Sequence, residues 1–291
     1  MASTQELTRR IKSVKSTRKI TRAMQMVSAS KMRRAQNATL ASRTYTELAR
    51  ELISGLGNVE KYHNPLLESH EKASKIGVIL ITTNKGLVGG FNSNLLTTLK
   101  SLELGDPELI AEIIAVGKKG AEAMVRTRRE LIAKFTNTDS TEKVKDVYPL
   151  VKMVTEIYKT KAYKKIVVVY NHFVSTLTQS PTTKVLLPFN FVREQRKAEK
   201  TINTWQVIFE PNRSEVLNHI IPRVLESQIY QALLESDASE HSARMVMMKN
   251  ATEAAGDLID DLTLTFNQLR QSKITTELSE ITAGRIALES N

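Results

Sequence analysis

Residues 239–288 read SEHSARMVMMKNATEAAGDLIDDLTLTFNQLRQSKITTELSEITAGRIAL. Residues at alternating spacings of three and four occupy the a and d positions of a coiled-coil heptad. This seam consists of Met245, Met248, Thr252, Ala255, Ile259, Leu262, Phe266 and Leu269. Proline is absent from the segment, and Gly256 lies off the seam. We therefore expect a long helix that needs a partner, although Met, Thr and Ala fill positions where Leu and Ile would give most stability.

The partner is expected at the N-terminus, where residues 3–57 have the pattern of one long helix. Ser3 or Thr4 can cap it, and Gly55 and Gly57 can end it. Its expected seam is Leu7, Ile11, Val14, Ile20, Met24 and Val27. At 1.5 Å per residue, such a helix spans roughly 80 Å, which fits an extended arm better than a globular helix.

Between these helices, short apolar segments alternate with helical ones. Strands are expected at 76–81, 112–117, 131–135 and 165–173, with an edge strand at 184–189 that ends at Pro188. Alternating strands and helices predict a mainly parallel sheet with right-handed crossovers.

The predicted fold class is α/β plus coiled coil. Two long terminal helices form an antiparallel coiled coil, and a Rossmann-like α/β domain is inserted between them. The expected divisions are an N-terminal helix at 1–57, a linker at 58–74, the α/β domain at 75–190, a connector at 191–211, and a C-terminal helix at 212–291 with a break near Pro222.

Composition excludes several classes of protein. The chain has 291 residues, of which 41% are hydrophobic, so it can bury a core. It contains no cysteine, which excludes disulfides, thiol catalysis and cysteine-ligated metals. No apolar run approaches the ~18 residues of a membrane span, so the chain is not expected to cross a bilayer by itself.

Positive charge is concentrated at the N-terminus. Residues 1–50 carry 12 Lys and Arg against two acids, a net +10 of the total +11. An acidic partner is expected there, which could be nucleic acid, a membrane surface or an acidic protein loop. Against DNA, no aromatic residue precedes Tyr45 and no helix-turn-helix or zinc pattern is present. The segment is also Ser-rich and acid-poor, as mitochondrial transit peptides are.

A glycine-rich segment, TNKGLVGGFN (83–92), follows the first expected strand. Such a turn could cradle a phosphate with Lys85, but the glycine spacing matches neither strong phosphate-binding motif. The simpler interpretation is that Gly86, Gly89 and Gly90 form a tight turn. The five histidines show no metal-ligand spacing, and no G-x-S-x-G motif occurs. We therefore expect no catalytic residues, metal or cofactor.

Three segments together resemble the gamma subunits of F-type ATP synthases. They are RRIKSVKSTRKITRAMQMVSASKMRRAQ (9–36), the glycine-rich segment 83–92, and residues 239–284. The resemblance covers the whole chain in the family's order. It begins by about residue 5, so no cleavable presequence is expected in front of it.

The resemblance implies a central rotor without an active site of its own. The family's two long helices turn inside a ring of three alpha and three beta subunits, where the beta subunits carry out catalysis. The foot sits with the epsilon subunit on the membrane ring of c subunits, and proton flow turns that ring. The expected protein couples proton flow to ATP synthesis or hydrolysis, regulates both, binds no nucleic acid, and is peripheral on the cytoplasmic face of a bacterial inner membrane.

The resemblance also implies contact residues. Arg244, Gln271, Thr275 and Glu277 match positions of polar contact with the ring, and Met24 matches a methionine near the beta-subunit lever loop. Lys31, Arg33 and Arg34 are added on charge alone, as residues that face acidic loops of the ring. Gly86, Gly89 and Gly90 would shape the foot. The cysteine pair by which chloroplast members are regulated is absent.

Overall fold

The computed structural model describes residues 4–55, 64–136, 144–189 and 212–289. The chain divides into two compact units, each described by itself below. The helical unit comprises residues 1–28 and 245–291, and the sheet unit comprises residues 29–244. The predicted connector at 191–211 and most of the first half of the linker lie outside the described residues.

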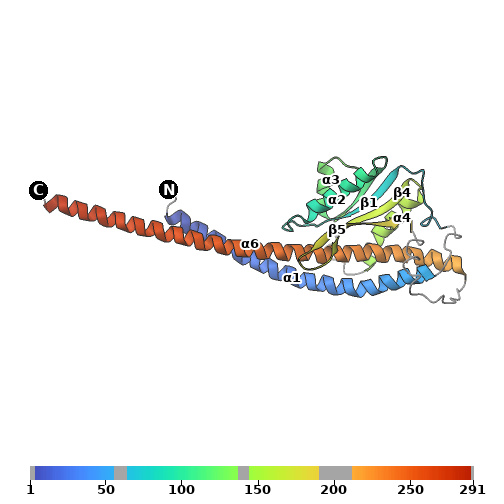
Figure 1. Cartoon of the computed structure of the whole chain (residues 1–291), viewed down its shortest axis with the longest axis horizontal. Coiled ribbons are helices and arrows are strands. Elements are labelled where there is room, and N and C mark those ends of the chain that lie inside the picture. Colours follow the sequence, from blue (N-terminus) through green and yellow to red (C-terminus); the bar gives the residue numbers. More distant parts are fainter. Residues whose placement is uncertain (1–3, 56–63, 137–143, 190–211, 290–291) are drawn as a thin grey trace. The chain divides into compact units, whose positions relative to one another are not determined.

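The sheet unit is built on five strands in the order β3-β2-β1-β4-β5 (Figure 1). Their bounds are β1 Lys75–Ile81, β2 Ile110–Val116, β3 Leu131–Phe135, β4 Tyr163–Phe173 and β5 Gln179–Leu187. The first four are parallel, and β5 pairs antiparallel with β4 at the edge. The mainly parallel sheet and its edge strand are confirmed. β5 begins five residues earlier than expected because it continues directly from a tight turn after β4.

Both faces of the sheet are covered, as a parallel sheet requires. One core joins the sheet to α2 (Phe91–Gly105) and α3 (Lys118–Arg126) through residues such as Val78 and Leu95. The other joins it to α4 (Tyr148–Lys159) and to the first part of α6 (Arg213–Glu289) through residues such as Ile79 and Leu225. A single turn of 3₁₀ helix, η3 (Val144–Val147), precedes α4. Adjacent β1 residues enter opposite cores, which follows from the two-residue period of a strand.

α1 (Thr4–Gly55) and α6 are the long terminal helices. In the helical unit, all eight predicted seam residues of α6 are buried or half-buried. The residues between them, such as Glu253 and Asp260, are mostly exposed. The seam predicted for α6 is therefore confirmed. Beyond Leu269, every residue of α6 from Arg270 to Arg285 is exposed.

The seam predicted for α1 is partly wrong. Ile20 and Val27 are 58% and 57% exposed. The predicted Leu7, Ile11, Val14 and Met24 are buried or half-buried, and so are positions 21, 25, 28 and 32; of all these, Leu7, Ser28 and Met32 are buried. Strict heptad spacing from Val14 reaches Arg18, Thr21 and Ser28, so geometry selects polar residues over the apolar ones beside them.

Gly256 lies outside the a and d positions, as expected, but still takes part in the packing of the two helices. It is buried, and a Cβ built on it would lie 3.5 Å from the guanidinium carbon of Arg18. The missing side chain leaves room for an arginine at a heptad position of α1. The glycine therefore belongs to the packing between the helices of this unit.

The expected break at Pro222 is wrong, because α6 is one helix of 77 residues with Pro222 inside it. Proline removes one hydrogen bond of the helical ladder, which usually kinks or ends a helix. Here, however, Leu217 and Ile221 on one side and Val224 and Leu225 on the other are all buried in the same core. This packing holds the two helical segments in line. None of the described helices is long and apolar enough to cross a membrane.

Candidate functional site

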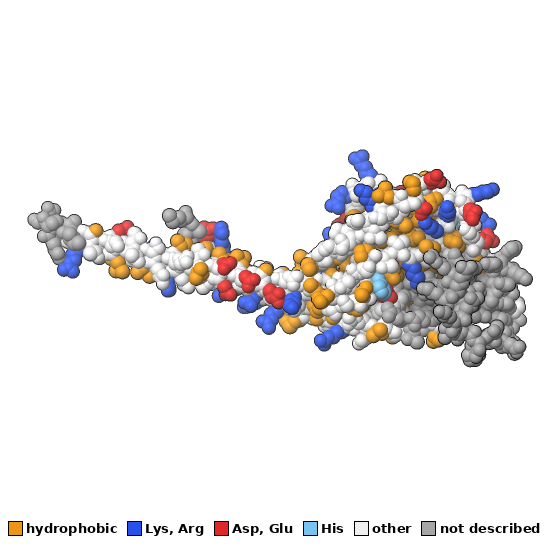
Figure 2. Space-filling view, viewed as in Figure 1, with side chains coloured by type: hydrophobic (Ala, Val, Ile, Leu, Met, Phe, Trp, Pro, Cys, Tyr) orange, Lys and Arg blue, Asp and Glu red, His pale blue; other side chains and the backbone are white. Residues whose placement is uncertain are grey.

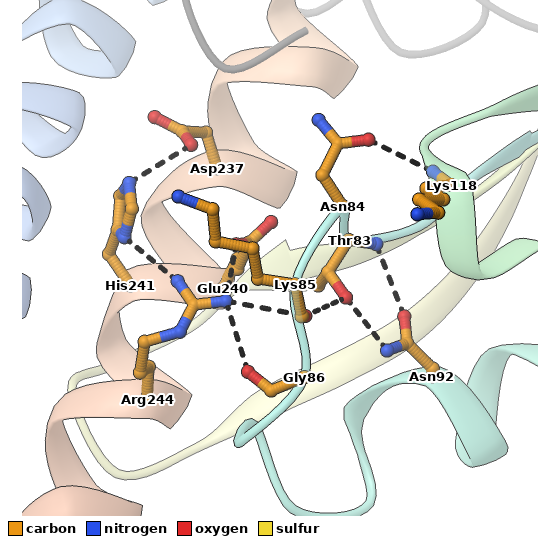
Figure 3. Close-up of polar contacts among 10 residues, drawn as sticks. All are labelled: Thr83, Asn84, Lys85, Gly86, Asn92, Lys118, Asp237, Glu240, His241 and Arg244. Carbon is orange, nitrogen blue, oxygen red and sulfur yellow. Dashed lines mark hydrogen bonds and ion pairs between the residues drawn. The ribbon is translucent and has the colours of Figure 1, made fainter. Parts of the chain in front are cut away.

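The glycine-rich turn lies between β1 and α2 and is stabilised by its own side chains (Figure 3). Asn92 Oδ1 accepts a hydrogen bond from the Thr83 amide at 3.2 Å, and Asn92 Nδ2 donates one to the Thr83 hydroxyl at 2.8 Å. That hydroxyl in turn donates to the carbonyl of Lys85 at 2.7 Å. Gly89 and Leu87 both have positive φ, at 58° and 65°. Only the glycine adopts this conformation without strain.

The amides at the start of α3, beside this turn, are already occupied. Lys118 N donates to Asn84 Oδ1 at 2.9 Å, Lys119 N to the Thr83 carbonyl at 3.0 Å, and Gly120 N to Thr82 Oγ1 at 2.8 Å. A helix binds phosphate through free amides at its first turn. Since the chain itself satisfies these amides, these three amides of α3 are not free to bind a phosphate.

Arg244 of α6 holds the turn from the other direction (Figure 3). Its guanidinium donates to the carbonyls of Gly86 at 3.4 Å and Lys85 at 3.5 Å, and pairs with Glu240 at 2.7 Å. Burial raises the pKa of the Glu240 carboxyl, and the opposing charge of Arg244 only partly offsets this effect. Arg244 is only 7% exposed, so the structure places this predicted contact residue inside the sheet unit.

The other predicted residues on α6 lie in the helical unit and are exposed. The Thr275 hydroxyl donates to the carbonyl of Gln271 at 3.0 Å, and Lys273 lies 3.7 Å from Glu277. Glu277 also borders an open groove of about 390 Å³ between the two helices. The groove is lined by Thr4, Gln5, Thr8, Phe266, Arg270, Lys273, Ile274 and Glu277. Of the other groove residues, the sequence pointed only to Phe266, as a seam residue, and to Thr4, as a possible helix cap.

The predicted residues of α1 fall in both units. Met24 is half-buried in the helical unit, whereas Lys31, Arg33 and Arg34 are exposed in the sheet unit. In the helical unit, residues 1–28 carry seven Lys and Arg and one acidic residue, a net charge of 7−1=+6. Residues 245–291 carry four Lys and Arg and seven acidic residues, a net charge of 4−7=−3. The space-filling view shows basic and acidic side chains along the visible face of this unit, with hydrophobic ones only in small groups (Figure 2).

A buried polar cluster at the opposite end of the strands was missed. The Glu112 carboxylate of β2 accepts hydrogen bonds from Lys75 Nζ of β1 and from the Tyr163 hydroxyl of β4. Burial tends to raise the pKa of Glu112, but these two hydrogen bonds and the charge of Lys75 outweigh burial and hold it below its ordinary value. The residues are too far apart in sequence to form a motif. Among the described residues, no three His, Cys, Asp or Glu side chains are grouped to hold a metal ion.

Known proteins match this chain over almost its whole length. A family model described as ATP synthase matches residues 3–288. The ATP synthase gamma chain of Roseiflexus castenholzii is 42% identical over 292 residues, covering 99% of both chains. That of Delftia acidovorans is 40% identical, covering 99% of this chain and all of the relative.

The chain belongs to the ATP synthase gamma chain family. Solved structures share its fold. A chain of the Euglena gracilis mitochondrial ATP synthase, in a complex described as OSCP/F1/c-ring, superposes with a TM-score of 0.70 at 21% identity, covering 99% of this chain and 95% of that one. A chain of the Tetrahymena thermophila enzyme, described as central stalk/c-ring, gives 0.61 at 26% identity, covering 80% and 99%.

The family match includes both long terminal helices as well as the sheet. The match includes the glycine-rich turn, all of α1 and all of α6 except its last residue, Glu289. The polar cluster around Arg244 is the point in the sheet unit where the turn and α6 meet.

Proposed function

We propose that this chain is the central rotor subunit of an ATP synthase. The observation that carries the proposal is the 42% identity to a gamma chain over 99% of both sequences. The match spans nearly all of both proteins, so no large segment of either one lacks a counterpart in the other.

Contacts within the helical unit support the finer architecture that we propose. The Thr21 hydroxyl lies 2.8 Å from that of Thr252, Arg18 lies against Gly256, and Thr8 shares a groove with Phe266. Positions fall along α1 as they rise along α6, which supports an antiparallel coiled coil. The sheet order and the helices on both faces support a Rossmann-like domain inserted at about 75–190. We propose residues 1–57 and 212–291 as the two helical segments of this coiled coil.

A rotor must be stiff along its length and must not adhere to a single neighbour. A continuous helix of 77 residues supplies roughly 115 Å of hydrogen-bonded backbone. The ion pairs Glu6–Arg10, Lys249–Glu253 and Lys273–Glu277 each join positions within one helix, and all six side chains lie at the surface. Exposed polar groups form contacts that water can replace, which suits a surface that slides past its partners.

The proposed contacts with the surrounding ring use the exposed predicted residues. Gln271, Thr275 and Glu277 would meet polar groups of the alpha and beta subunits, and Met24 would lie near a lever loop. Lys31, Arg33 and Arg34 would face acidic loops. Arg244 is the weakest of these proposals, because its guanidinium is buried and already bonded within the sheet unit.

The remaining partners and the location follow from the same role. The sheet unit would act as the foot, with an epsilon subunit and a ring of c subunits as its partners. The protein would be peripheral on the cytoplasmic face of a bacterial inner membrane, would couple and regulate proton flow and ATP turnover, and would contribute no catalytic residues. Regulation through a thiol pair is ruled out because the chain contains no cysteine.

Assembly with alpha and beta subunits tests this proposal. Purified alpha and beta subunits would be mixed with the chain, separated by gel filtration, and assayed for ATP hydrolysis. We expect a stable complex with faster hydrolysis than alpha and beta alone. If the chain elutes by itself and hydrolysis is unchanged, the proposal is wrong.

A further inference from the structure

We infer that Ser239, Ser242 and Arg244 form a two-sided clamp that prevents α6 from turning about its own axis within the sheet unit. The functional part of this inference, that the clamp carries torque, rests on the proposed rotor function. The three are positioning residues, since they would act on the orientation of the helix.

One side of the clamp is the hairpin between β4 and β5. The Ser239 hydroxyl donates to the carbonyl of Asn171 at 3.0 Å, and the Ser242 hydroxyl donates to the carbonyl of Thr176 at 2.6 Å. Both serines are fully buried. Because serine is small, the helix can approach the hairpin backbone closely.

The other side is the glycine-rich turn after β1. Arg244 donates to the carbonyls of Lys85 and Gly86, and its pairing with Glu240 fixes the guanidinium (Figure 3). Two residues along a helix differ by about 200° in direction, so Arg244 points away from the side on which Ser242 lies. Ser239 and Ser242, three residues apart, point the same way.

The two sides are themselves joined. The Asn171 side-chain amide donates to the carbonyl of Phe91 at 3.3 Å, where α2 begins directly after the glycine-rich turn. β1 and β4 are neighbours in the sheet, and the chain leaves them in opposite directions, toward β2 and toward β5. Crevices at such a point bind ligands in many open sheets. In this chain, α6 occupies that position.

A helix gripped on one side can roll, whereas a helix bonded on two sides cannot roll without breaking one set of bonds. The acceptors outside α6 are all main-chain carbonyls, that of Asn171 in β4 and the others in the loops that follow β1 and β4. α6 runs on as the same helix from Arg244 to Met245, where the division between the units falls. A twist applied to α6 would thus be passed to the sheet at these three residues.

The test uses Ser239→Ala with Ser242→Ala, which removes the hairpin side and leaves the proposed ring contacts unchanged. Ser236→Ala is the matched control, because Ser236 is a buried serine of the same helix with no hydrogen bond to either loop among the described residues. The complex would be immobilised through its ring, and a bead would be attached to a single cysteine introduced at the exposed Leu104, with cysteines of the other subunits replaced. The angular variance of the bead would be measured without ATP.

We expect the double variant to raise the angular variance about twofold or more over the unchanged chain and the control, since two buried hydrogen bonds are lost. Equal variance in all three would overturn the torque role. Hydrogen exchange on the free chain tests the clamp itself: the Ser175 amide, which bonds the Thr178 carbonyl at 3.0 Å, should exchange about tenfold faster in the double variant only. Unchanged exchange would overturn the clamp whether or not the rotor proposal stands, whereas failure of the unchanged chain to assemble would count against the rotor alone.

Discussion

The hydroxyl oxygens of Thr21 and Thr252 lie 2.8 Å apart and join α1 to α6 across the seam of the helical unit. One hydroxyl donates to the other across the seam, and the acceptor uses its own single proton within its helix, toward the Arg18 carbonyl for Thr21 or the Met248 carbonyl for Thr252. A polar pair at a heptad position can fix the register of two helices at a cost in stability.

Replacing one threonine should cost more than replacing both. Thr252→Val should lower the free energy of unfolding by about 1 kcal/mol, because it leaves the Thr21 hydroxyl facing a methyl group. Thr21→Val with Thr252→Val should come within about 0.5 kcal/mol of the unchanged chain, since neither hydroxyl is then left unpaired. Urea unfolding would measure both. Thr263→Val is the control, because the Thr263 hydroxyl bonds its own helix. A double variant that is less stable than Thr252→Val would refute the coupling.

Stability should fall in acid partly through Glu112. Its pKa is lowered in the folded chain, so folding favours the ionised carboxylate. That stabilisation is complete above the ordinary pKa of 4.5 and is lost as pH falls through the lowered folded value. Glu112→Gln should therefore be less stable at neutral pH and show a shallower loss of stability below pH 4.5. Parallel profiles for the two proteins, from thermal melts across pH, would contradict this account.

Gly117 should tolerate no side chain. Its φ is 99°, and a Cβ built there would lie 2.1 Å from the Thr82 carbonyl oxygen. Gly117→Ala should cost more than about 3 kcal/mol, because the backbone of β1 or the start of α3 must move. Gly86→Ala serves as the comparison, since nothing lies within 4 Å of its added Cβ, and should change stability by less than about 0.5 kcal/mol. Similar losses for both variants would show that backbone clash is not the cause.

Charge reversal at Arg33 should weaken assembly with the ring. Arg33→Glu should raise the dissociation constant for alpha and beta subunits about tenfold at low salt, with a smaller effect at high salt. Lys100→Glu is the control, since Lys100 is an exposed cation on α2 of the sheet unit and is not a proposed contact residue. An equal effect of the two changes would argue for net charge rather than a local contact.

The sequence predicted elements well where one period dominated. The eight seam residues of α6 followed from spacing, and the core strands β1 and β4 followed from short continuous apolar runs. The seam prediction fails at Ile20 and Val27 because these residues are apolar but do not lie at strict heptad positions. Heptad spacing instead selects Thr21 and Ser28. Pro222 was misread because the local cost of proline is visible in sequence, while the packing of Ile221 and Leu225 that outweighs it is not.

Sites built from distant residues could not be predicted in the same way. Lys75, Glu112 and Tyr163 meet because three parallel strands are neighbours, and no spacing in the sequence records that order. Arg244 was identified as a contact residue from the family resemblance, but its carbonyl partners in the glycine-rich turn depend on where α6 crosses the end of the sheet. Ser239 and Ser242 gave no signal, since serine in a helix is ordinarily neutral.

Rotation of the sheet unit within an assembled complex is the most direct test of the rotor account. A bead attached to a cysteine at Leu104 would be followed by video microscopy after ATP is added to a complex fixed through its alpha and beta subunits. The account predicts sustained rotation in one direction that stops when ATP is removed. A bead that stays at one angle while the same complexes hydrolyse ATP would contradict it.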